Sequence, residues 1–225
     1  MNKETTTSMK NLFFDFDGTI ANTQEGIVNA LEYMANDLKI ANLGVQTYQK
    51  FIGPAITDSI QKYYPDFPKS RYPEAIKSYQ SFYNSKGVYQ LKLYDKMPET
   101  LAKLQADGYK LYVSSVKPES LVKILIPHLD LDKYFSGIYG ASDDETTRNT
   151  KKAILRYGMD NAGVSASDSV MIGDRMTDME GGVANGVHTL GVTYGFGDYQ
   201  ELSHSGAEHI VEHVTDIPEG VKQFD

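Results

Sequence analysis

The sequence contains no cysteine among its 225 residues. This absence excludes disulfide bonds, thiolate catalysis and cysteine-ligated metal sites, and it fits a reducing compartment. The chain also lacks any run of about 18 consecutive apolar residues, the length that a membrane-spanning helix requires. The first ten residues, MNKETTTSMK, contain no apolar stretch of the kind found in secretory signals. We therefore expect a cytoplasmic protein that does not enter a membrane.

Positive charge is scarce and scattered. Lys and Arg total 22 against 30 Asp and Glu, which gives a net charge of −8, and the basic residues form no block. This balance argues against nucleic acid as an electrostatic partner. With 40% hydrophobic and 23% charged residues, the composition is that of a globular protein. A chain of this length forms one large domain or a domain with a smaller one inserted.

Short apolar segments alternate with amphipathic segments along most of the chain. Strands are predicted over residues 11–16, 109–115, 135–142, 169–174 and 187–194. Their nearly continuous apolar character is typical of a parallel sheet that is covered on both faces. Helical patterns lie between the later strands, and we expect two of these helices to end at Gly108 and Gly158. The alternation predicts an α/β fold with a Rossmann-like, doubly wound parallel sheet.

The stretch from 23 to 90 interrupts this alternation with helical patterns alone. Its first helix is marked by Ile27, Leu31, Met34 and Leu38, and two more helices are predicted within 53–64 and 69–87. A helical insert after the first strand of such a sheet is expected to cover the carboxyl ends of the strands, where ligands bind. We therefore predict a flexible tail (1–10), a catalytic core (11–22 and 91–225) and a helical cap (23–90).

Carboxylates follow two of the predicted strands. The segment NLFFDFDGT ends a hydrophobic strand with Asp15 and Asp17, and Gly18 then permits a sharp turn; MIGDRMTD places Asp174 after a second strand, with Asp178 four residues on. Two like charges about 4 Å apart repel by roughly 4 kcal/mol at an effective dielectric constant of about 20. A hard divalent cation with oxygen ligands offsets this repulsion. We predict a Mg²⁺ site formed by the four aspartates.

Two further segments indicate an anionic ligand. Ser114 and Ser115 lie at a strand end before a helix, where backbone N–H groups and a hydroxyl can hold a phosphate oxygen. Lys151 and Lys152 begin another helix. A cation there interacts unfavourably with the helix dipole, and an anionic partner would explain why a lysine occupies this place. The alternatives are that the serines form a plain helix cap and that the lysines are solvated surface charges. These patterns alone leave open which of Lys151 and Lys152 would bind the anion.

In this order, the motifs DFDGT, VSSVKP, Lys151 and GDRMTD resemble the haloacid dehalogenase superfamily of aspartate-nucleophile phosphatases, over roughly residues 11–218. The helical insert resembles the small cap of the phosphoglycolate phosphatase-like branch. Within the insert, FIGPAI (51–56) resembles the cap segment of that branch that lies near the substrate.

The resemblance implies a role for each matching residue. Asp15 would be the nucleophile, Asp17 the general acid and base, and Lys151 the cation that steadies the nucleophile and the phosphoryl group. Mg²⁺ would be held by the Asp15 carboxylate, the Asp17 backbone carbonyl and Asp174. Asp178 would lie next to these ligands, in the second shell around the ion. Substrate contacts would come from Gly18, Thr19, Ser115, Val116, Gly53 and Pro54. Val116 departs from the pattern, because many relatives have Asn or Ser there, and a polar contact is lost.

These roles describe a Mg²⁺-dependent phosphatase that hydrolyses a small phosphorylated metabolite, similar to phosphoglycolate, through an aspartyl-phosphate. The expected assembly is a monomer or a homodimer. A 5'-nucleotidase, a pyrophosphatase or a sugar phosphomutase of the same superfamily is the enzymatic alternative. Outside the enzymes, the alternatives are a receiver-like signalling domain and a silent relative that acts as a binding module.

Overall fold

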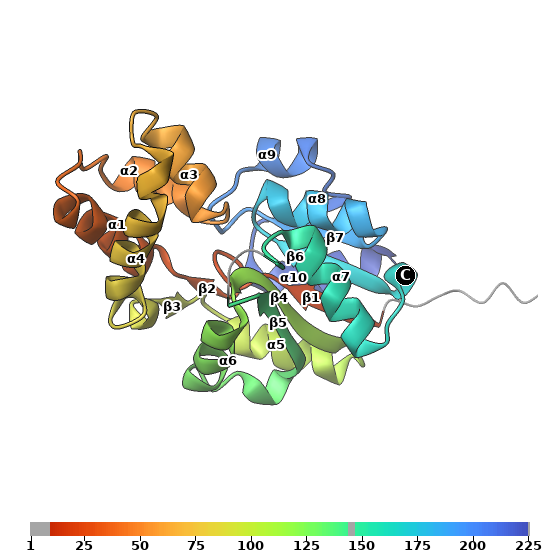
Figure 1. The fold of residues 1–225 in the computed structure, drawn as a ribbon. Coiled ribbons are helices and arrows are strands. Elements are labelled where there is room, and N and C mark those ends of the chain that lie inside the picture. Colours follow the sequence, from red (N-terminus) through yellow and green to blue (C-terminus); the bar gives the residue numbers. More distant parts are fainter. Residues whose placement is uncertain (1–9, 144–146, 225) are drawn as a thin grey trace, which may run out of the picture. The chain divides into compact units, whose positions relative to one another are not determined.

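The computed structural model describes residues 10–143 and 147–224. The expected tail (1–10) lies outside this part of the chain except for Lys10, as does the middle of the acidic loop 141–147. The chain divides into two compact units, one of residues 1–20 and 93–225 and one of residues 21–92 (Figure 1). Among the described helices, none has the length and apolar character needed to cross a membrane.

The larger unit is built on a six-stranded parallel sheet. Its strands are β1 (Asn11–Phe14), β4 (Lys110–Pro118), β5 (Phe135–Ala141), β6 (Ser169–Gly173), β7 (His188–Val192) and β8 (His209–Val211). Their order across the sheet is β5-β4-β1-β6-β7-β8, and all the neighbours are parallel. The predicted doubly wound α/β fold is confirmed.

Strand β1 lies at the point where the strand order reverses. The chain moves from β1 to β4 and β5 on one side, and then returns to β6, β7 and β8 on the other. Phe14, the last residue of β1, pairs with Val113 of β4 and Ile172 of β6. In open α/β sheets, ligands bind outside the carboxyl ends of the strands at such a reversal. A ligand site is therefore expected at the residues just after these three strands.

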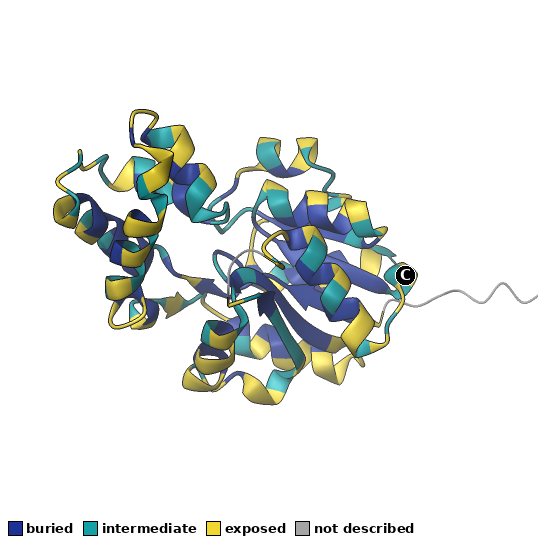
Figure 2. Cartoon of the chain, viewed as in Figure 1, coloured by how far each residue is buried: buried dark blue, intermediate teal, exposed yellow. Residues whose placement is uncertain are grey.

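Helices cover both faces of this sheet (Figure 1). They are α5 (Met97–Ala106), α6 (Glu119–His128), α7 (Lys151–Ala162), α8 (Met176–Asn185), α9 (Tyr199–His204) and α10 (Ile217–Val221). On one face Phe13, Tyr112 and Met171 pack against Leu155 and Met159 of α7. The central strands β1, β6 and β7 are mostly buried, and many exposed residues lie on the helices (Figure 2), so the middle of the sheet is the centre of the core.

Helix α7 is longer than the sequence predicted. Gly158, where we expected the helix to end, lies inside it, and the helix ends before Gly163, which has a φ of 64°. A Cβ atom at Gly158 would lie 2.8 Å from the ring of Tyr139 on β5. The glycine therefore serves close packing of the helix on the sheet rather than a chain reversal.

The smaller unit contains α1 (Gln24–Asp37), α2 (Val45–Tyr48), α3 (Ile56–Tyr63) and α4 (Tyr72–Tyr83). The predicted apolar face of α1 is buried at Ile27, Leu31 and Met34, and α1 packs against α4. A short ribbon pairs β2 (Ala21–Asn22) with β3 (Lys92–Leu93). Within the described residues of both units, short 3₁₀ turns lie at Gln49–Phe51, Lys69–Arg71, Gly87–Tyr89, Asp132–Tyr134, Ala166–Asp168, Val214–Asp216 and Lys222–Phe224.

Candidate active site

The end of β1 directs a carboxylate toward α7. Because successive side chains of a strand alternate between faces, Asp15 continues the face on which Phe13 packs against α7. The backbone N–H of Asp15 donates to the carbonyl of Ile172 on β6 at 2.9 Å, which fixes this end of the strand. The chain then turns at Gly18, whose φ is 85°. A Cβ atom at Gly18 would overlap Asp174 Oδ2, so only glycine allows this approach.

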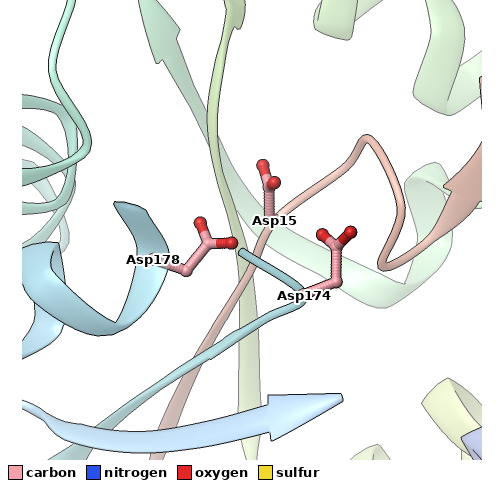
Figure 3. A group of neighbouring side chains, drawn as sticks. All are labelled: Asp15, Asp174 and Asp178. Atoms are coloured by element: carbon pink, nitrogen blue, oxygen red, sulfur yellow. The ribbon is translucent and has the colours of Figure 1, made fainter. Parts of the chain in front are cut away.

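Three buried aspartates meet at the carboxyl ends of β1 and β6. Asp15 follows β1, Asp174 follows β6, and Asp178 lies in the first turn of α8 (Figure 3). Each offers a carboxylate oxygen, and these oxygens lie within 4.8 Å of one another. All three residues are at most 5% exposed. Of the four aspartates in the predicted Mg²⁺ site, these three lie together, whereas Asp17 is not part of this group; their binding of Mg²⁺ stays a prediction.

Lys151 lies between two of these carboxylates. It is the first residue of α7, and its Nζ lies 2.8 Å from Asp15 Oδ1 and 2.7 Å from Asp178 Oδ1. The same ammonium donates to the carbonyl of Ser114 at 2.8 Å. Lys152 is exposed. The sequence left open which of the two lysines belongs to the site. In the structure Lys151 lies in the cluster and Lys152 does not.

Burial controls the protonation of the cluster. It raises the pKa of Asp15 to about 7; the nearby Lys151 opposes this increase, while the charges of Asp178 and Asp17 add to it. Burial also raises the pKa of Asp174 well above its usual range, with further increases from Asp178 and Asp15. For Lys151 burial alone would lower the pKa, but Asp15 and Asp178 outweigh it and raise the pKa above the ordinary value. The cluster holds more negative charge than one lysine neutralises.

Asp174 is held at both oxygens by neighbouring segments. The hydroxyl of Thr19 donates to Oδ1 at 3.1 Å, and the backbone N–H of Phe196 donates to Oδ2 at 2.7 Å. Within the described residues, Asp174 forms no ion pair of the kind that Asp15 and Asp178 form with Lys151. It is therefore the carboxylate of the cluster whose charge the described protein compensates least.

The second aspartate of the first motif has a lysine of its own. Asp17 is half-buried, and its Oδ1 lies 3.1 Å from Nζ of Lys117. Ser115 is buried, and its hydroxyl accepts a bond from the backbone N–H of Lys117 at 3.3 Å. Val116 between them is half-buried. The structure therefore brings the second motif next to the first through Lys117, and the contact of Ser115 with phosphate stays a prediction.

The predicted substrate contacts of the helical unit lie on a turn of that unit. Gly53, with a φ of 103°, and Pro54 stand just before α3, and both are half-buried. Their contact with substrate stays a prediction. Thr19, also predicted to contact substrate, is fully buried and donates its hydroxyl to Asp174.

Two residues of the site were missed from the sequence. Lys117 received no role, although a lysine two residues after the predicted phosphate-binding serine was a signal for an anionic neighbour. The second is Phe196, in the glycine-rich segment GVTYGFG (191–197), whose spacing does not match the dinucleotide fingerprint. Glycines just after a strand also indicate close backbone approach, and here this segment carries the Phe196 N–H that binds Asp174.

A comparison with protein families now assigns the chain. The sequence profile of the haloacid dehalogenase-like hydrolases matches residues 12–192. The chain belongs to this family. The predicted resemblance is thereby confirmed, and the receiver-like alternative is set aside.

Three individual proteins illustrate what the chain is similar to. The chain is 35% identical over 192 residues to a 5'-nucleotidase of Pseudomonas aeruginosa, covering 85% of this chain and 86% of that protein. It is 26% identical to the tyrosine-protein kinase PtkA of Mycobacterium tuberculosis (92% of this chain, 70% of the relative). It is 27% identical to a phosphoglycolate phosphatase of Aquifex aeolicus (84% and 86%).

A solved structure extends the match to the whole fold. A predicted phosphatase from Clostridium acetobutylicum superposes with a TM-score of 0.91 at 33% identity, covering 96% of this chain and 99% of that one. The family and its phosphatase-named members support a phosphatase, and the active-site carboxylates fit a divalent metal.

Proposed function

We propose that the chain is a Mg²⁺-dependent phosphatase that hydrolyses a small phosphomonoester through an aspartyl-phosphate on Asp15. The observation that carries this proposal is the buried cluster of Asp15, Asp174 and Asp178 around Lys151 at the carboxyl ends of the strands. A carboxylate nucleophile needs a cation beside it and a second group that moves protons. Lys151 lies beside Asp15, and Asp17 follows two residues later.

The residues fit a hard divalent cation. The donors are carboxylate oxygens, which Mg²⁺ prefers, and together they hold excess buried negative charge. We propose that Asp15 and Asp174 bind the ion directly, with the backbone carbonyl of Asp17, as the family resemblance implies. Asp178 already pairs with Lys151 and accepts the N–H of Arg175 at 3.0 Å, so its role would be to orient Lys151. Bound Mg²⁺ would neutralise charge on the phosphoryl oxygens.

The residues divide the chemistry into two steps. Asp15 attacks phosphorus and forms the acyl phosphate, while Asp17 protonates the leaving oxygen. Asp17 then takes a proton from the water that hydrolyses this intermediate. Lys151 holds the Asp15 carboxylate and balances the charge of the transferred group. Ser115 is proposed to donate its hydroxyl to a phosphate oxygen.

The substrate class is proposed from the relatives. A small phosphomonoester similar to phosphoglycolate is consistent with the Aquifex relative, while the more similar Pseudomonas relative favours a nucleoside 5'-monophosphate as the second candidate. We propose that the helical unit, including Gly53 and Pro54, selects the leaving group. The ligand would be a small phosphorylated metabolite rather than nucleic acid or a membrane. We propose that the protein is cytoplasmic and is a monomer or a homodimer.

Phosphate release from a substrate panel tests this proposal. The purified protein should hydrolyse para-nitrophenyl phosphate with Mg²⁺ and lose this activity in EDTA. The panel then compares phosphoglycolate, nucleoside 5'-monophosphates, hexose phosphates and pyrophosphate by kcat/KM. Isomerised hexose phosphate instead of released phosphate would identify a mutase. No turnover of any ester, with Mg²⁺ present and the fold intact by circular dichroism, would contradict the proposal.

A further inference from the structure

Lys117 forms a second buried lysine–aspartate pair at the site. Its Nζ lies 3.1 Å from Asp17 Oδ1, and the two side chains are only 5% and 13% exposed. This pair stands beside the pair of Lys151 and Asp15, in which the nitrogen and oxygen are 2.8 Å apart. Each aspartate of the first motif therefore has its own lysine, one from the end of β4 and one from the start of α7.

An irregularity of β4 produces this contact. Ser114 pairs with Tyr139 of β5, and Pro118 pairs with Ala141, so β4 advances four residues while β5 advances two. The hydroxyl of Ser115 accepts the backbone N–H of Lys117 inside this irregular segment. Bulges beside active sites re-aim side chains. Here the irregular segment carries Lys117, whose ammonium lies beside Asp17 on the neighbouring chain segment after β1.

A buried ammonium requires compensation for its lost hydration, and an ion pair in such a place adds little net stability. Exposed pairs, such as Lys103 with Asp107 at 2.9 Å, avoid this desolvation cost. The placement of Lys117 is thus hard to attribute to stability of the fold. Its consequence is local, because the ion pair restricts the rotation of the Asp17 side chain.

We propose that Lys117 is a positioning residue that holds the Asp17 carboxylate in the orientation from which it exchanges protons with the leaving group and with water. This inference rests on the proposed role of Asp17 as general acid and base. It assigns to Lys117 no contact with the substrate. Lys117 would act through Asp17, as Lys151 acts on Asp15.

A double-mutant cycle tests the inference. The four proteins are wild type, Lys117→Met, Asp17→Asn and the double variant, assayed with saturating Mg²⁺ on an alkyl phosphate and on para-nitrophenyl phosphate. Misplaced catalytic groups cost up to about 100-fold in rate, so Lys117→Met should lower kcat on the alkyl phosphate by about 10- to 100-fold with little change in KM. The loss should be smaller on para-nitrophenyl phosphate, whose leaving group needs little protonation. In the Asp17→Asn background the same change should cost almost nothing further.

Two further variants separate positioning from structure. Lys117→Gln keeps a donor for the Asp17 carboxylate and should recover part of the lost kcat, and it replaces Lys117→Met in the cycle if that variant does not fold. Lys103→Met removes an exposed ion pair on α5 and should match wild type.

Other results would overturn the inference. Additive losses in the cycle, an equal loss on both esters, or a raised KM at unchanged kcat would show that Lys117 acts on the phosphate or only on the fold. An unchanged Lys117→Met variant would exclude any role. An inactive wild type or a fully active Asp17→Asn variant would instead count against the proposed function.

Discussion

The backbone N–H of Phe196 donates to Oδ2 of Asp174 over 2.7 Å. Gly195 makes this bond possible, because a Cβ atom there would overlap the carbonyl of Gly18 and Cβ of Asp174. A segment more than 170 residues from β1 along the chain thus fixes a carboxylate that faces Asp15, as second partners commonly orient metal ligands.

Gly195→Ala should therefore weaken Mg²⁺ binding by about 10- to 100-fold, the usual effect of losing a partner that orients a ligand. Isothermal titration of Mg²⁺ into the substrate-free protein measures this directly. The matched control is Gly220→Ala, where a Cβ atom would lie 2.9 Å from Val211, away from the carboxylates. The control should lose stability but keep its Mg²⁺ affinity. An unchanged affinity in Gly195→Ala would mean that the segment does not orient Asp174.

Substitution of the two adjacent lysines at the start of α7, Lys151 and Lys152, should show which of them acts in the active site. Lys151→Met removes the ammonium that contacts Asp15 and Asp178, so we expect kcat to fall by at least about 100-fold. Lys152→Met changes an exposed side chain and should leave kcat near the wild-type value. Steady-state kinetics on para-nitrophenyl phosphate compare the two. A larger loss in Lys152→Met would reverse the assignment of the active-site lysine.

Asp174→Asn should stabilise the metal-free protein and remove most of the stabilisation that Mg²⁺ gives to wild type. Burial and neighbouring carboxylates destabilise the charged form of Asp174, so the neutral amide should raise the melting temperature of the metal-free protein at neutral pH. Wild type should gain about 2.7 kcal/mol from Mg²⁺ at 100 times its Kd, and the variant should gain almost none. Thermal melts with Mg²⁺ and with EDTA measure both effects. Equal stabilisation of both proteins by Mg²⁺ would remove Asp174 from the metal site.

The raised pKa of Asp15 predicts a pH dependence. The group binds its proton up to about pH 7 in the folded state, whereas its ordinary pKa is 3.8, so between these values the folded state holds more protons than the unfolded state. The stability that Asp15 contributes is therefore fully present below about pH 4 and is lost as pH rises through 7. Metal-free wild type should lose more stability between pH 5 and 8 than Asp15→Asn, as measured by denaturant unfolding. Mg²⁺ affinity should rise over the same range, because binding displaces the proton. Parallel stability curves for the two proteins would contradict this.

Much of the fold was predictable because each prediction rested on a local pattern. Continuous apolar segments such as the one before Asp15 identify buried parallel strands, and carboxylates after two of them locate the site at one edge of the sheet. The end of α7 was misplaced because Gly158 and Gly163 both suit a helix terminus, and only the packing of Tyr139 distinguishes them.

The missed parts of the site depend on contacts between distant segments. The ion pair of Lys117 with Asp17 arises from an irregularity of β4, and strand patterns in a sequence do not reveal a register shift. The bond from Phe196 to Asp174 uses a backbone N–H, which every residue but proline carries. Its side chain therefore gives no signal of the contact.

Asp15 is proposed to carry the phosphoryl group while Asp17 moves protons, and a quenched reaction of Asp17→Asn separates these two roles. The amide keeps the size of the side chain and the backbone carbonyl, but it cannot exchange a proton, a function typically worth about 10²–10⁴-fold in rate. With para-nitrophenyl phosphate, attack by Asp15 should outlast hydrolysis of the intermediate, so the variant should release a burst of nitrophenol. Mass spectrometry after an acid quench should then find a phosphoryl group on the peptide that contains Asp15. No burst and an unlabelled peptide, alongside an active wild type, would rule out Asp15 as the nucleophile and indicate direct attack of water on phosphorus.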